Sequence, residues 1–78
     1  MEPDLYDYYY DEIETRIIDN DYATHLTISM NDIRKCGYSS RTEFEEDVIL
    51  LIISSLVKKY HKDFEILQQK LSNCIKYV

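Results

Sequence analysis

The fold depends on residues 42–78, TEFEEDVILLIISSLVKKYHKDFEILQQKLSNCIKYV. Thr42 and Glu45 have the spacing of a helical capping box, and further acidic residues follow them in the first turn. Negative charge is favoured there by the helix dipole. We therefore expect a helix to begin at residue 43 and to open a helical region over residues 43–78.

Apolar residues recur along this region at the spacing of an α-helix. The intervals between them average about 3.6 residues, close to the period of an unstrained helix. The members of this stripe are Ile49, Ile53, Leu56, Tyr60, Phe64, Leu67, Leu71, Cys74 and Val78. Because the stripe stays in phase throughout, one long helix is favoured. The alternative is a break at which Asp63 caps a second, antiparallel helix.

Residues 48–57 are apolar on nearly every side of such a helix. A two-stranded sheet covers only one face, so either the chain folds back on itself or a second copy covers the rest. We expect a homodimer. The residues assigned to its interface are Ile49, Ile53, Leu56 and Tyr60.

Residues 13–30, upstream of the helical region, have the composition of two strands. Ile13–Asp19 and Tyr22–Met30 are apolar-rich runs on either side of a polar turn at residues 19–21. In the second run, apolar and polar side chains alternate, which is typical of a strand with one wet face. The sequence therefore predicts a β-hairpin over residues 13–30.

Residues 31–42 connect this hairpin to the helical region as a turn and a loop. Asn31-Asp32 can cap a short helical turn, and Gly37 can end it. The predicted fold class is α+β in one domain, residues 1–78. It consists of a small β-hairpin or short antiparallel sheet followed by one long or two antiparallel helices.

The N-terminal 21 residues concentrate the acidic charge. They hold eight of the fifteen acidic side chains and one of the nine basic ones, together with four tyrosines. Residues 1–12 are predicted to form an acidic, Tyr-rich arm, and carboxylates mixed with phenols are typical of a binding surface. The expected partner is basic. The residues assigned to partner binding are Asp4, Tyr6, Asp7, Tyr8, Tyr9, Tyr10, Asp11, Glu12 and Glu14.

Patterns that indicate catalysis or a cofactor are missing from the sequence. The single glycine excludes a glycine-rich phosphate loop. His25, Cys36, His61 and Cys74 are 11, 25 and 13 residues apart, without the paired spacing of a zinc site. The many carboxylates form no recognisable acid–base pair. We expect no enzyme activity, no metal and no cofactor.

Residues 25–30, HLTISM, followed by the loop at 37–42 and a helix, resemble the ribbon-helix-helix repressors. This family implies polar strand residues that read the DNA major groove. Its first helix would have to fit into Asn31–Cys36, which is too short, and the polar strand face offers no lysine or arginine to meet phosphate. With a net charge of −6, the chain is expected to make no direct contact with nucleic acid.

Membrane insertion is not expected either. The longest apolar run, Val48–Ile53, has six residues, against the roughly 20 that a membrane-spanning helix needs. The N-terminus is acidic where a signal peptide is basic and then apolar. The expected location is the cytoplasm, or the host cell interior if the protein is viral or from a phage.

These features together predict a stoichiometric inhibitor or decoy. Its acidic, Tyr-rich surface would occupy the basic nucleic-acid-binding site of a partner such as a nuclease. In size and charge the chain resembles phage and viral antagonists of host nucleases, anti-CRISPR proteins among them. The alternative is a small homo-oligomeric scaffold or assembly protein that acts through its apolar helix.

Overall fold

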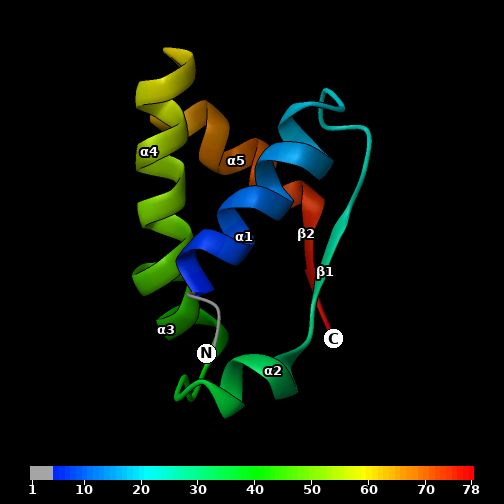
Figure 1. Ribbon diagram of the computed structural model, residues 1–78, viewed down its shortest axis with the longest axis vertical. Helices are drawn as coiled ribbons and strands as arrows, with labels where there is room; N and C mark the ends of the chain where they lie inside the picture. Colours follow the sequence, from blue (N-terminus) through cyan, green and yellow to red (C-terminus); the bar gives the residue numbers. More distant parts are fainter. Residues whose placement is uncertain (1–4) are drawn as a thin grey trace.

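The computed structural model describes residues 5–78, which form a mostly helical globule with a two-stranded parallel sheet (Figure 1). Four continuous helical stretches occur within these residues. The elements are α1 (Leu5–Ile13) with the π-helical segment η1 (Glu14–Ile18), β1 (Leu26–Ile28), α2 (Met30–Lys35), α3 (Arg41–Phe44) with η2 (Glu45–Ile49) and α4 (Leu50–Tyr60), α5 (Phe64–Cys74) and β2 (Ile75–Tyr77).

The N-terminal prediction is wrong. Residues 5–18 form a helix, not an arm followed by the first strand of a hairpin. Tyr9, Ile13 and Ile17 recur every four residues and are all buried, so they line one helical face that packs into the core. The β-branched residues around Ile17 favour a strand locally, but packing of this face decides for the helix.

The predicted turn at residues 19–21 is present, but it ends a helix and does not join two strands. Asp21 and Tyr22 both have positive φ angles, 54° and 63°, and the Tyr22 N–H donates to the Ile17 carbonyl at 2.8 Å. The chain then runs to β1, which is shorter than the predicted strand over 22–30.

The two strands are parallel, which corrects the predicted hairpin. Leu26 is paired with Ile75 and Ile28 with Tyr77, so β1 joins the far end of the chain (Figure 1). A parallel pair cannot be closed by a tight turn, and here α2 to α5 make the crossover. Within β1 the predicted alternation is confirmed, since Leu26 and Ile28 are buried while Thr27 is exposed.

The predicted short helical turn in the connecting segment is present as α2, but its predicted cap is wrong, because Asn31 and Asp32 lie inside the helix. Ser29 caps it by accepting from the Asp32 N–H, and Gly37 follows its end with a φ of +100°. The next helix begins at Arg41, because Ser40 accepts from the Glu43 N–H at 3.2 Å. Its cap is therefore two residues earlier than the capping box predicted at Thr42.

The prediction of one uninterrupted C-terminal helix, which the apolar stripe favoured, is also wrong. His61 has a left-handed conformation (φ 55°, ψ 46°) that ends α4, and Asp63 accepts from the Ile66 N–H at 3.1 Å to start α5. The structure thus has the break at Asp63 that the sequence left as the alternative. Beyond the break, Leu67 and Leu71 of the stripe are buried, while Phe64 at the first position of α5 is 36% exposed.

The core lies where α1, the helix over 41–60, α5 and the sheet meet. Phe44 is fully buried, and its ring packs edge-on against Tyr9, Tyr38 and Tyr77 at centroid distances of 5.4, 5.5 and 6.4 Å. Cys74 is buried and Cys36 is exposed, and both are free thiols. Within residues 5–78, no helix has the length and hydropathy required to cross a bilayer.

Candidate protein-interaction surface

The predicted partner-binding residues lie on three different faces of α1 and η1. Asp4 lies outside the described residues. The other eight are divided because an α-helix turns by about 100° per residue, so that neighbours in sequence point in different directions. Each face has a different environment, and only one of them is open to a partner.

The inward face contains Tyr9. This residue is only 6% exposed, and its ring contacts both Phe44, at 5.4 Å, and Tyr8, at 5.0 Å. Burial raises the pKa of the Tyr9 hydroxyl above its ordinary value. Tyr9 is therefore a core residue.

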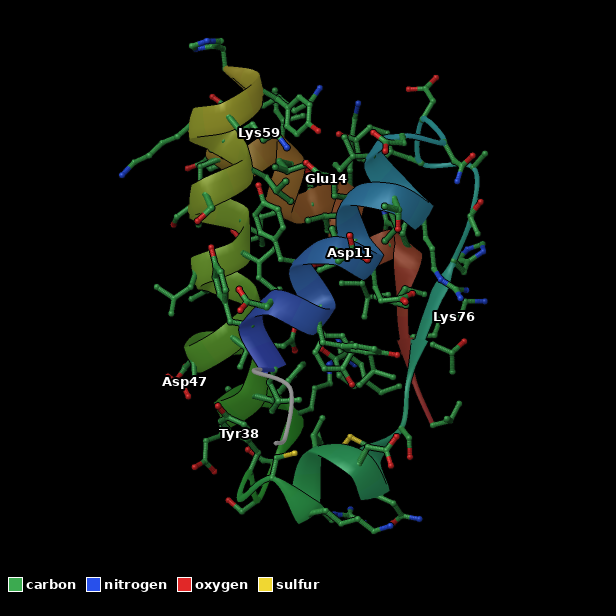
Figure 2. All side chains as sticks on the ribbon, in the orientation of Figure 1. Asp11, Glu14, Tyr38, Asp47, Lys59 and Lys76 are labelled. Atoms are coloured by element: carbon green, nitrogen blue, oxygen red, sulfur yellow. The ribbon has the colours of Figure 1, made fainter. Side chains whose placement is uncertain are left out.

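A second face of α1 is directed at α4. The Tyr6 hydroxyl and Ser55 Oγ are 2.5 Å apart, and Tyr10 is half-buried with its ring 5.9 Å from that of Tyr6. Glu14 accepts from Lys59 and, at 2.7 Å, from the Tyr60 hydroxyl. Figure 2 shows the Glu14 and Lys59 side chains pointing toward one another. These polar contacts attach α1 to α4.

The Glu14 contacts predict a change in acid stability. Hydrogen bonds from Lys59 and then Tyr60 lower the pKa of Glu14 below its ordinary value of 4.5. The carboxylate therefore stabilises the fold above that value, and this contribution is lost as the pH falls through the folded-state pKa. Glu14→Gln should have a Tm that falls less between about pH 6 and about pH 3 than that of the native chain.

The measurement is a series of thermal melts at several pH values. Lys59→Met removes the same ion pair from the other side and should flatten the curve in the same way. The effect should be small, because the Lys59 side chain is half exposed to solvent. Parallel losses of Tm in the native chain and both variants would contradict this assignment.

The third face of α1 is open to solvent. We call Asp7, Tyr8, Asp11 and Glu12 the acidic face. Asp7 and Asp11 are exposed and stand one helical turn apart, about 6 Å along the helix axis. Asp11 lies on α1 (Figure 2). Glu12 forms an ion pair with Arg16, whereas neither aspartate has an ion pair with any residue in 5–78. Tyr8 is 50% exposed.

A cavity adjoins the acidic face, and the sequence had not indicated it. It has a volume of about 350 Å³ and is mostly apolar. We call it the Tyr8 pocket; its lining residues are Leu5, Tyr8, Tyr9, Leu26, Thr27, Ser29, Asp32 and Val78. They come from α1, β1, the first turn of α2 and the C-terminal residue, so only the tertiary fold brings them together.

The predicted homodimer interface lies largely inside the single chain. Ile49, Ile53 and Leu56 are buried in the core, and Tyr60 is half-buried and bonded to Glu14. These side chains are covered by other parts of the same chain.

The other polar clusters of the described residues are held by contacts within the fold. No group of three or more metal-ligating side chains occurs within residues 5–78. A further cavity of about 280 Å³ lies beside η2 and α5, but its Arg41 and Glu45 bond each other at 2.9 Å, and Arg41 stacks on Tyr77. Tyr38 donates to Asp47, which raises the pKa of the tyrosine to about 12. The carboxylates of Glu45 and Asp47 are thus both bonded to side chains of the same chain.

No protein-family model, curated protein or solved structure is significantly similar to this chain.

Proposed function

We propose that this protein is a non-enzymatic, stoichiometric inhibitor or decoy. Through the acidic face of α1 it would occupy the basic nucleic-acid-binding site of a partner protein. The observation that supports this proposal is the pair of exposed carboxylates on Asp7 and Asp11, which have no cationic partner within residues 5–78, beside a half-exposed Tyr8.

The spacing of these carboxylates suits a site that binds phosphates. Each strand of a DNA duplex carries one phosphate per about 3.4 Å of the duplex axis, and two carboxylates about 6 Å apart along a helix axis present negative charge at a spacing of the same order. The fold holds this spacing because α1 is attached to α4 through Glu14 and Tyr6. A preformed surface loses less conformational entropy on binding than a flexible acidic arm would.

Tyr8 adds contact area to this charged surface. Tyrosine offers a large, rigid ring and a hydroxyl at low cost in conformational entropy, and it is frequent at the energetic centres of interfaces. The adjoining Tyr8 pocket supplies an apolar recess next to the charge. Charge accelerates the encounter, and the recess provides contacts that hold the complex.

The test compares the native chain with the double variant Asp7→Asn/Asp11→Asn in affinity capture from a nuclease-treated lysate. We expect the native chain to retain a basic nucleic-acid-handling protein with about tenfold higher affinity, as two exposed charge contacts would give. The captured protein should be displaced by an excess of DNA or RNA oligonucleotide. The retention should also fall with salt, because exposed charges are screened beyond about 8 Å at physiological ionic strength.

The matched control is Asp19→Asn/Asp21→Asn. It makes the same change in net charge at the far end of the N-terminal segment, where both aspartates are exposed. This control should bind like the native chain. Equal losses in both double variants would assign the effect to overall charge, and a partner that oligonucleotides do not displace would refute the decoy function.

A further inference from the structure

β1 is the outer strand of the sheet, and its free edge carries unpaired backbone groups. The register pairs Ile28 with Tyr77, and the Ile28 carbonyl accepts from the Val78 N–H at 3.0 Å. In a parallel ladder, alternate residues of a strand direct both backbone groups to the same neighbour. The N–H and C=O of Thr27 therefore point away from β2. In Figure 1, no element lies beyond β1 on that side of the described chain.

The Tyr8 pocket lies where a third strand would place its side chains. An added strand would run about 4.8 Å beyond β1, with alternate side chains on the same sheet face as Leu26 and Ile28. The buried Leu26 of that face lines the pocket together with Tyr8 and Tyr9 of α1, and Thr27 also lines it. A side chain of the added strand that faces inward would enter the pocket. Val78, which is 73% exposed, forms part of its wall.

The charge near the β1 edge favours a basic partner segment over a second copy of this chain. Asp32 lines the pocket, and the acidic face stands beside it on α1. Lys76, which is paired with Thr27, is exposed on the other face of the sheet, away from Leu26 and Ile28 (Figure 2). A second copy of this chain would bring two such surfaces together, each belonging to a molecule of net charge −6. A basic segment would instead gain from the same carboxylates.

We propose that an extended segment of a basic partner adds to the β1 edge as a third strand. An apolar side chain of this segment fills the Tyr8 pocket, and flanking lysines or arginines meet the carboxylates of α1 and Asp32. This mode of binding rests on the proposed function and names the partner's chemistry. Main-chain hydrogen bonds to Thr27 supply affinity, and the pocket supplies specificity, as in other proteins that bind by strand addition.

The probe for this proposal is the peptide Lys-Lys-Val-Thr-Val-Lys-Lys, tested on the full chain. Its charge-matched control is Lys-Lys-Ser-Gly-Ser-Lys-Lys. Amide NMR with hydrogen exchange should show slower exchange at Thr27 with the first peptide, and affinity about tenfold above that of the control. N-methylation at alternate amides of the first peptide should remove this advantage without any change to the protein.

A pair of variants tests the same edge from the protein side. Thr27→Pro removes an N–H that does not bond to β2, and proline is tolerated at such edge positions. Thr27→Val keeps the N–H and removes only the hydroxyl. We expect Thr27→Pro to lose about tenfold in affinity for the first peptide and Thr27→Val to bind it like the native chain. The N-methylated peptide keeps the proposal testable should Thr27→Pro fail to fold.

Equal binding of the two peptides, without a change in exchange at Thr27, would overturn strand addition. The proposed function would survive that result if Asp7→Asn/Asp11→Asn still weakened both peptides. Failure of both peptides to bind at low salt would overturn the inference, and the lysate experiment would judge the proposed function separately. Slower exchange at Thr27 that depends on protein concentration alone would assign the edge to a second copy.

Discussion

Phe44→Ala should lower the free energy of unfolding by about 3–5 kcal/mol, the usual cost of removing a fully buried aromatic ring. Phe44 has no exposed surface, and three tyrosine rings pack edge-on around it, from α1, the loop before α3, and β2. These rings cannot easily close the space that the substitution leaves, because they belong to separate elements. A chain of this size has a total stability of about 4–12 kcal/mol, so the variant should lose a large part of it.

The measurement is chemical denaturation followed by circular dichroism. The matched control is Phe64→Ala, the same chemical change at the other phenylalanine of the chain, which is 36% exposed at the start of α5. The control should cost clearly less, about 1–2 kcal/mol, because Phe64 is already partly exposed and its removal leaves no closed cavity in the core. Similar losses at the two positions would contradict the packing described here.

Tyr9→Ala and Tyr8→Ala should have opposite consequences, although the two residues are adjacent. Tyr9 is 6% exposed and packs on Phe44, so its removal should cost about 3 kcal/mol of stability. Tyr8 is 50% exposed, so its removal should cost only the edge contact with Tyr9, about 1 kcal/mol or less. Both tyrosines line the Tyr8 pocket, but binding should respond in the reverse order, since Tyr8 is exposed on the acidic face while Tyr9 has little surface to offer a partner.

Denaturation of both variants measures the first effect. Affinity for the lysine–valine peptide, at a temperature where both variants are folded, measures the second. Tyr8→Ala should weaken peptide binding by about tenfold, as expected for one aromatic contact of an interface. If residues 1–12 formed an exposed arm, both substitutions would leave stability unchanged and both would weaken binding.

Signals in the sequence were most reliable for structure that depends on residues close together in the chain. The short helical turn before Gly37, the helix predicted from residue 43 and the alternation in residues 26–28 are all present, because side-chain periodicity and polar helix-start residues act within a few residues. The caps were misplaced, since Ser29 and Ser40 cap these helices in place of Asn31-Asp32 and Thr42. The candidate surface was predicted only in part. Asp7, Tyr8 and Asp11 are exposed as expected, whereas Tyr6, Tyr9, Tyr10 and Glu14 contact the rest of the fold.

That division of the N-terminal residues could not be read from composition. Residues 13–18 contain enough β-branched side chains to favour a strand, and the helix is stabilised by burying Ile13 and Ile17 against other elements. A one-residue rotation of this helix would expose Tyr9 and bury Tyr10 in its place. Which tyrosine is exposed therefore depends on which face of the helix packs against the core.

The sequence by itself determined the concentration of acidic charge near the N-terminus, the presence of helices shortly after residues 29 and 40, and the periodicity of the apolar residues, because these are properties of neighbouring residues. Only the tertiary structure decided three other features: the helical N-terminal segment, the break at His61, and the parallel pairing of residues 26–28 with 75–77. The left-handed conformation of His61 costs about 1–2 kcal/mol, which burial of Leu67 and Leu71 on the returning helix offsets. Parallel pairing joins strands from distant parts of the chain, so no local pattern marks it. The free edge of β1 and the pocket beside it exist only because that pairing forms.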